Sequence, residues 1–220
     1  MILAIETATP HGSAALVSGG LVRAEAELPP GRQASGTILS AVDELLRKTG
    51  TEPGDVGHVA VSAGPGSFTG LRVGMAAAKG FCFGWRIPIV PVPTLHALAW
   101  RFRPVGMTVC PVLDARKKEV YAALFRWEGG ACVRLSPDMA IAPGELPGKL
   151  PGGPVFFCGN GAWPFAPLFR ERMGERAVFA SGEEGLPRAA AVGLFAAHLV
   201  LAGVAGDTCK AVPAYVRPFN

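Results

Sequence analysis

A glycine-rich stretch in the first third of the chain constrains the fold more than any other segment. Residues 64–74 read Gly-Pro-Gly-Ser-Phe-Thr-Gly-Leu-Arg-Val-Gly and follow the apolar run His58 to Ala63. The glycines permit positive φ and close backbone approach, and the proline holds the residue before it in an extended conformation. The pattern therefore predicts a strand, a tight loop and the start of a helix, capped by Ser67 or Thr69.

Two well-known phosphate loops do not fit this stretch. A Walker A loop would need Lys and Ser or Thr after Gly70, where the chain has Leu71 and Arg72. The dinucleotide fingerprint would need a glycine where Thr69 stands. The N–H groups at the helix start could still bind an anion, because the helix dipole favours negative charge there. A turn that only joins strand to helix is the other interpretation.

The helix predicted from Leu71 to Gly84 is almost entirely small or apolar, and Arg72 and Lys79 are its only charges. A surface helix of a small α/β layer keeps one face in water unless another element covers it. Ala76 and Phe83 lie on the same stripe as the two charges. The pattern predicts a covered stripe but leaves two covers open, a partner protein or a neighbouring helix of the same chain.

The composition is that of a globular protein with little bias towards nucleic acid. The 220 residues are half hydrophobic and carry a formal net charge of +4. The densest basic group, residues 116–118, is followed by Glu119 and is interpreted as a solvated turn. Asp114, Arg116, Glu119 and Tyr121 are interpreted as an ion-paired hairpin rather than a binding cluster.

Cysteine and histidine usage predicts a reducing compartment and no metal site. The cysteines form no Cys-x-x-Cys pair, so we expect free thiols. The histidines are too dispersed for a metallopeptidase motif. These residues are Cys82, Cys110, Cys132, Cys158 and Cys209, and His11, His58, His96 and His198. The first residues lack the basic region of a secretory signal. The uncharged run Ala189 to Gly206 is interpreted as a buried helix after Pro187. We therefore expect a soluble, cytoplasmic protein.

The order of predicted elements suggests two successive copies of one pattern. The first copy reads βββαβαβα, with strands at 2–5, 14–17, 21–28, 59–62 and 87–92, and helices at 38–48, 71–84 and 94–102. The second begins with strands at 109–113, 120–127 and 132–135 and continues with strands at 155–158 and 178–180 and a helix at 187–203. A Pro- and Gly-dense loop at 142–154 interrupts it.

Two βββαβαβα units are typical of the actin-like ATPase superfamily, an α/β ribonuclease H-like (ASKHA) fold, here with a reduced second lobe. We expect lobes at 1–104 and 105–220, with the helix 187–205 and the C-terminal tail packing back on the first lobe. Such folds place a metal-orienting acid at the end of the first strand, where this chain has Glu6 and Thr7; a strand end and a turn are the alternative. The candidate nucleotide or anion loop comprises Glu6, Thr7, Gly64, Gly66, Ser67 and Thr69.

Several strings together resemble the TsaB (YeaZ) family of bacterial tRNA threonylcarbamoyladenosine synthesis. They are Ile2 to Thr9, the loop Gly64 to Gly74, Lys79-Gly80, Asp114 to Arg116 with Glu119 to Tyr121, and Pro213 to Arg217. Their order and spacing cover nearly the whole chain. The chain departs from the family at Glu6, where Asp is common, and at Gln33-Ala34-Ser35, where the family has a polar His-Ser or His-Thr pair.

The resemblance implies a non-catalytic scaffold without catalytic or metal-binding residues or a cofactor of its own. Family members pair with the catalytic paralogue TsaD and with the ATPase TsaE, and ATP acts in the assembled complex that modifies adenosine 37 of tRNA. The resemblance also implies a homodimer when the chain is alone, and pairing through the first two helices of the first lobe. On this chain the implied interface is Leu39, Val42, Leu46, Phe68, Arg72, Ala76, Lys79 and Phe83.

A small-molecule kinase of the same superfamily is the alternative function. It would need a full second lobe and an acidic catalytic base, for which the eroded second copy leaves little room. A serine hydrolase is disfavoured because the chain has no Gly-x-Ser-x-Gly elbow and Ser67 is better explained as a helix cap.

Overall fold

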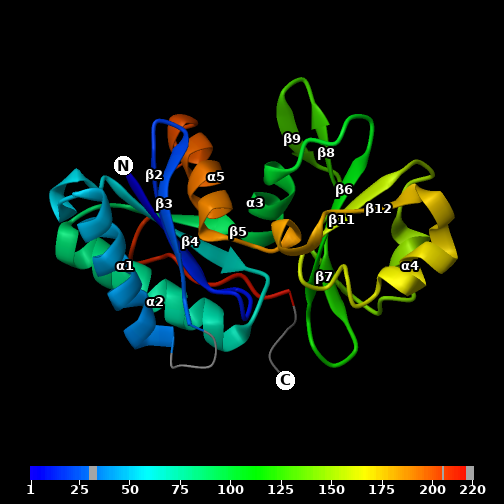
Figure 1. Cartoon of the computed structure of the whole chain (residues 1–220), viewed down its shortest axis with the longest axis horizontal. Helices are drawn as coiled ribbons and strands as arrows, with labels where there is room; N and C mark the ends of the chain where they lie inside the picture. Colours follow the sequence, from blue (N-terminus) through cyan, green and yellow to red (C-terminus); the bar gives the residue numbers. More distant parts are fainter. Residues whose placement is uncertain (30–33, 205, 217–220) are drawn as a thin grey trace. The chain divides into compact units, whose positions relative to one another are not determined.

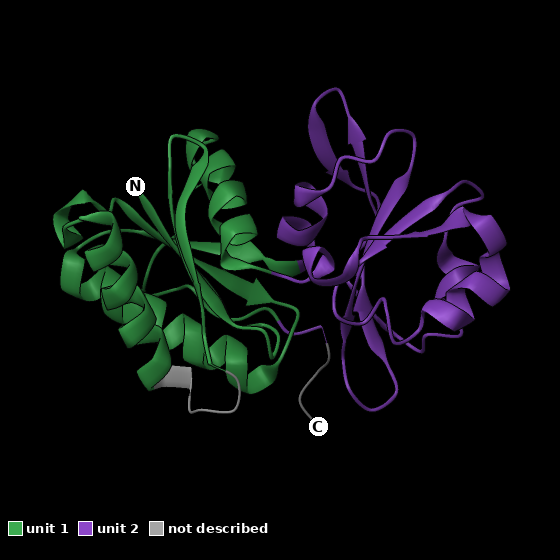
Figure 2. Cartoon of the chain, in the orientation of Figure 1, with its two compact units in different colours: residues 1–94, 188–214 green, residues 95–187, 215–220 purple. Residues whose placement is uncertain are grey.

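The structure is a computed structural model of the whole chain and describes residues 1–29, 34–204 and 206–216, without the side chains of residues 34 and 35. Gln33, Arg217 and residue 205 of the expected 187–205 helix therefore lie outside the described residues. The chain forms two compact units (Figure 2). Unit 1 comprises residues 1–94 and 188–214, and unit 2 comprises residues 95–187 and 215–220.

Unit 1 is built on a five-stranded mixed sheet with the order β3-β2-β1-β4-β5. Its first three strands form an antiparallel meander, and β4 and β5 are added in parallel. The strands are β1 (Ile2–Glu6), β2 (Ser13–Ser18), β3 (Leu21–Glu27), β4 (His58–Gly64) and β5 (Ile89–Pro93). Parallel strands need crossover connections, which the helices between them supply.

Helices cover both faces of this sheet (Figure 1). α1 (Ala34–Thr49) and α2 (Phe68–Trp85) cover one face, and α5 (Ala189–Leu201) covers the other; η1 (Pro53–Asp55) is a short 3-10 turn. β1 is buried along its whole length because both of its faces are covered. Leu3 and Ile5 join the core under α1 and α2, whereas Ala4 faces α5 at Gly193.

The sheet also holds the first turn of α5. Ser13 Oγ accepts the Ala189 N–H at 2.8 Å, and Glu25 accepts the Ala190 N–H at 3.0 Å. Arg188 pairs with Glu27 at 3.2 Å. The stretch Gly182–Leu201 is long and apolar enough to cross a membrane, and 44% of that window is buried. The part of it that forms α5 packs on β1 and β2, as core helices of this composition do.

Unit 2 contains a seven-stranded sheet with the path β10-β7-β6-β11-β12, and β8 pairs with both β6 and β9. Its strands are β6 (Thr108–Asp114), β7 (Val120–Ala122), β8 (Phe125–Glu128), β9 (Ala131–Arg134), β10 (Met139–Ile141), β11 (Val155–Cys158) and β12 (Ala177–Phe179). Its helices are α3 (Thr94–Arg101), whose first residue is the last of unit 1, and α4 (Ala166–Met173), with the short turns η2 (Leu146–Lys149), η3 (Gly174–Arg176) and η4 (Gly182–Gly185).

The predicted actin-like fold is confirmed, but several details of the prediction are wrong, among them the omission of β10. The units divide at residue 94 and not at 104, because α3 packs with unit 2. The single strand expected at 120–127 is two strands, β7 and β8, which both pair with β6 but differ in their second neighbour, β10 for β7 and β9 for β8. No helix was expected at 166–173, where α4 lies over the ring of Phe157 through Phe169. The helix α5 belongs to unit 1, so the second copy of the pattern returns to the first sheet at its end.

Candidate functional site

The glycine loop is packed tightly against the residues that follow β1. A Cβ at Gly66 would lie 2.6 Å from the Ala8 oxygen, and a Cβ at Gly70 would lie 2.0 Å from the Thr7 oxygen. At Gly74 it would lie 2.1 Å from Thr7 Oγ1, which itself donates to the Gly70 oxygen at 2.8 Å. The glycines therefore let the start of α2 approach the turn after β1 more closely than any side chain would permit.

Three N–H groups of this loop, those of Gly64, Ser67 and Gly70, donate hydrogen bonds within unit 1. Gly64 N–H donates to Thr94 Oγ1 at 3.1 Å, and Ser67 N–H donates to the Ala8 oxygen at 2.7 Å. Gly70 N–H donates to Ser67 Oγ at 3.3 Å, so Ser67 caps the helix. The sequence predicted either Ser67 or Thr69 as the cap, and Thr69 is exposed. These contacts explain the loop by packing and capping. Anion binding there stays a prediction.

Glu6 is completely buried at the end of β1, and its donors come from the chain itself. Ser62 of β4 donates its hydroxyl to Glu6 Oε2, and Ala8 N–H donates to Oε1 at 2.5 Å. Burial raises the pKa of the Glu6 carboxyl to about 7, and hydrogen bonds from Ser62, Ala8 and Thr9 offset part of that rise. Glu6 thus ties β1 to β4, a contact that the sequence pattern did not reveal because Ser62 looks like an ordinary strand residue.

One face of α2 is exposed and carries large apolar side chains. Phe83 is 88% exposed and Phe68 is 43% exposed. Arg72 and Ala76 are exposed between them, and Gly80 and Gly84 have no atom within 4 Å of an added Cβ. The Arg72 guanidinium lies 3.8 Å from the centre of the Phe68 ring. Most of the stripe predicted from the sequence therefore lies on the surface of unit 1, and no helix in the described part of the chain covers it.

Some residues of the expected interface are buried or half-buried within unit 1. Val42 is 2% exposed and belongs to the core of unit 1, and Leu46 is half-buried against that core. Only Leu39 of the three α1 residues is well exposed, at 57%. Lys79 is half-buried, and its Nζ donates to the Cys209 oxygen at 3.3 Å. Val42 is thus a core residue, and Lys79 fastens the C-terminal segment to α2.

The C-terminal segment 206–214 also packs beside β5 and the glycine loop, although hydrophobic periodicity predicted no element there. Gly206 pairs with Ile89 at the edge of the sheet, and Ala214 N–H donates to the Ala63 oxygen at 2.6 Å. The Ala214 oxygen also lies 2.3 Å from where a Cβ of Gly64 would be. The string Pro213 to Arg217 gave a signal, but only as part of the family resemblance.

The other titratable groups do not converge on a site in the described part of the chain. No group of three or more His, Cys, Asp or Glu side chains among those residues could hold a metal ion. Burial raises the pKa of the Cys110 and Cys158 thiols well above the ordinary value and that of Cys132 to about 11. These thiols therefore stay protonated and poorly nucleophilic at neutral pH.

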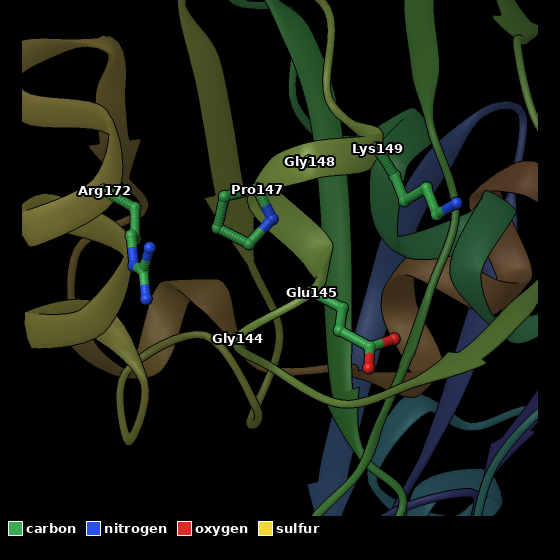
Figure 3. Close-up of a pocket in the computed structure, with 6 residues that line it drawn as sticks. All are labelled: Gly144, Glu145, Pro147, Gly148, Lys149 and Arg172. Carbon is green, nitrogen blue, oxygen red and sulfur yellow. The ribbon is translucent and has the colours of Figure 1, made fainter.

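Unit 2 has an open hollow of about 630 Å³ between η2 and α4 (Figure 3). Its lining residues are Gly144, Glu145, Pro147, Gly148, Lys149 and Arg172. The three charged side chains are exposed, and those of Glu145 and Lys149 point away from Arg172 in Figure 3. The hollow therefore offers no set of groups aimed at a common ligand.

Similarity to known proteins agrees with this architecture. The family described as TsaD, tRNA N6-adenosine threonylcarbamoyltransferase, matches residues 18–207. The tRNA threonylcarbamoyladenosine biosynthesis protein TsaB of Escherichia coli is 42% identical over 127 residues, which span 57% of this chain and 54% of that protein. The Bacillus subtilis protein of the same name is 28% identical over 98% of this chain and 93% of its own length. A structure of YeaZ from Pseudomonas aeruginosa, 28% identical, superposes with a TM-score of 0.82 over 98% of this chain and 99% of that one.

The fold, the glycine loop packed against residues 7 and 8, and the match over residues 18–207 define an actin-like α/β protein related to the threonylcarbamoyltransferase family. The chain belongs to the TsaD family and, within it, to the TsaB (YeaZ) group. The resemblance drawn from the sequence strings is thereby confirmed.

Proposed function

We propose that this chain is a non-catalytic subunit of the machinery that makes threonylcarbamoyladenosine in tRNA, and that it pairs with its catalytic paralogue TsaD through the exposed face of α2. The names of its relatives support the pathway. The observation that carries the pairing is the exposure of Phe68, Ala76 and Phe83 along one face of α2, whose opposite face packs into the core.

The stripe has the composition of a helix-packing surface. Large apolar side chains stand at its ends, exposed Ala76 and Gly80 lie between them, and an added Cβ at Gly80 or at Gly84, next to Phe83, would meet no atom within 4 Å. Such small residues let a second helix approach closely, while exposed aromatic rings supply most of the buried area. Leu39 of α1 extends the apolar surface sideways, since α1 packs beside α2. The same surface supports a homodimer when the paralogue is absent.

The interior of unit 1 supports a scaffold role over a nucleotide-processing one. The acid at the end of β1 has its donors within the chain, and the glycine loop is occupied by the backbone of residues 7 and 8. We accordingly assign ATP use to the assembled complex, with TsaE as a further partner, and we assign the protein to the cytoplasm, where tRNA is modified.

Reconstitution tests this proposal. Purified TsaD and TsaE of the same organism, with ATP, the threonylcarbamoyl donor and an unmodified tRNA transcript, should form the modified nucleoside only when this chain is added. This chain alone should neither hydrolyse ATP at rates above about 1 per second nor modify tRNA. Full modification without the chain, or ATP turnover by the chain alone, would contradict the proposal.

A further inference from the structure

The loop between β6 and β7 has an unusual backbone for its sequence. Arg116, Lys117 and Lys118 have φ values of 57°, 50° and 62°, so three consecutive residues with side chains adopt the left-handed conformation. This conformation brings Cβ too close to the following carbonyl oxygen and is normally left to glycine, asparagine or aspartate. The loop projects from the sheet of unit 2 at the lower end of the β6–β7 hairpin in Figure 1.

Elsewhere in the described chain, positive φ is adopted almost entirely by glycine. Eleven glycines have positive φ, and the only non-glycine residue that does so outside this loop is Arg86, at the end of α2. Glycine would adopt the conformation of residues 116–118 more easily. Retaining Arg and two Lys there, against the backbone preference, points to a role for the side chains themselves.

Hydrogen bonds hold the turn in place. Asp114 Oδ1 accepts the Arg116 N–H at 2.8 Å, and Glu119 N–H donates to the Arg116 oxygen at 3.0 Å. Ala115 N–H donates to the Glu119 oxygen at 3.0 Å, and Asn160 Oδ1 accepts the Asp114 N–H at 3.2 Å. Asp114 thus has the structural role in the hairpin that was expected, through a hydrogen bond to the turn backbone, and the ion pairing of the hairpin stays a prediction. These hydrogen bonds hold the backbone from which the side chains of Arg116, Lys117 and Lys118 extend.

The three side chains are exposed, and the ion pairs recorded between described residues include none of them. Successive residues of a left-handed turn are about 100° apart around its axis, as in the mirror-image right-handed helix. Three cations at successive positions therefore diverge from the tip. A single carboxylate could meet only one of them, whereas a nucleic-acid backbone presents charges at intervals of a few ångströms.

We propose that the turn formed by Arg116, Lys117 and Lys118 is a contact for the phosphate backbone of RNA, and that it positions the tRNA without reading its bases. An acidic protein surface is less suited, because carboxylates on a folded surface are interspersed with other side chains. This inference rests on the proposed function for the identity of the RNA.

The test uses the full chain, a fluorescently labelled tRNA transcript and anisotropy titrations at several salt concentrations between roughly 50 and 200 mM. The test variant is the triple change Arg116→Gly, Lys117→Gly and Lys118→Gly, which removes the charges and suits the backbone. The matched control is Arg86→Gly, which removes one exposed charge from the one other left-handed non-glycine position. Thermal melts of all three proteins accompany the titrations.

We expect the triple variant to bind tRNA at least about tenfold more weakly near 0.1 M salt, with the logarithmic salt dependence reduced by about 2 to 3. Its melting temperature should equal or exceed that of the wild type, and Arg86→Gly should bind tRNA normally. Absence of salt-dependent tRNA binding by the wild type, or equal binding by the triple variant, would overturn the inference. A triple variant that keeps tRNA affinity but loses TsaD would overturn it in favour of an acidic protein partner.

The same measurements distinguish a failure of the RNA contact from a failure of the proposed pairing with TsaD. If the wild type binds tRNA through the turn but does not associate with TsaD, the RNA contact is supported and the pairing is refuted. If it associates with TsaD but binds tRNA independently of the turn, the pairing stands and the RNA contact is refuted.

Discussion

At the scale of single residues, buried polar contacts and close backbone approaches explain the buried acid and the glycine loop of unit 1. Glu6 links β1 to β4 through Ser62, and the glycines of the loop are required by the backbone of residues 7 and 8. Their patterns suggested ligand binding because a carboxylate at a strand end and a glycine loop also suit a phosphate site. The packing partners come from distant parts of the chain, so no local pattern could name them.

Glu6 should make stability fall as the pH rises. Its pKa is about 7 when folded and 4.5 in the reference state, so its contribution is fully present below about pH 4.5 and is lost as the pH approaches 7. The wild type should lose up to about 3 kcal/mol over this window relative to Glu6→Gln, at 1.36 kcal/mol per pKa unit.

Urea unfolding at several pH values measures this difference. Glu145→Gln, on the exposed hollow of unit 2, is the control and should follow the wild type. Parallel curves for wild type and Glu6→Gln would show that the carboxyl is not desolvated as the structure has it.

Two glycines of α2 should respond oppositely to alanine. Gly70→Ala places a Cβ 2.0 Å from the Thr7 oxygen, so α2 must move, and we expect a loss of about 2–4 kcal/mol of unfolding free energy. Gly80→Ala meets nothing within 4 Å and should gain about 0.5–1 kcal/mol. Chemical denaturation of both variants decides the matter, and similar effects at the two positions would refute the close approach.

At the scale of elements, hydrophobic periodicity predicted the helices and strands of unit 1 within a few residues. It was less informative in unit 2. α4 is only eight residues long and has three buried side chains, so its helical period is weak. Residues 122–125 are all buried, so the change of second neighbour from β10 for β7 to β9 for β8 leaves no change in the hydrophobic pattern.

The periodicity of α1 also conflicts with the interface residues taken from the resemblance. Ile38, Ala41, Val42 and Leu45 form its buried face at spacings of three and four. That spacing places Val42 inside and Leu39 outside, as the structure does. The spacing had predicted only the helix, and Leu39 and Val42 were both assigned to the interface from the family resemblance. For the stripe of α2 two covers, a partner protein or a neighbouring helix, had been left open.

The attachment of α5 should depend on Ser13. Ser13→Ala removes the buried acceptor of the Ala189 N–H, and we expect a loss of about 1 kcal/mol of unfolding free energy. Ser40→Ala is the control, because exposed Ser40 only donates back to Gly36 within α1, and it should change stability by less than about 0.5 kcal/mol. Equal losses, measured by thermal or urea melts, would mean that Ser13 does not cap α5.

At the scale of the whole molecule, unit 1 has an exposed apolar face on α2 and unit 2 has a cationic turn. The loop glycines and the buried acid of unit 1 serve its own packing, and the outer face of α2 stays exposed. We accordingly propose that the outer face of α2 pairs with another protein.

Sedimentation velocity of the chain with and without TsaD tests this claim most directly, using Ala76→Glu in the middle of the stripe. Ala76 is exposed in the chain, so the variant should keep the wild-type melting temperature, while a carboxylate buried against a partner should weaken association roughly a hundredfold or more. Ala131→Glu, at an exposed position of β9 in unit 2, should pair normally. Undiminished association of the Ala76→Glu chain with TsaD would contradict the account.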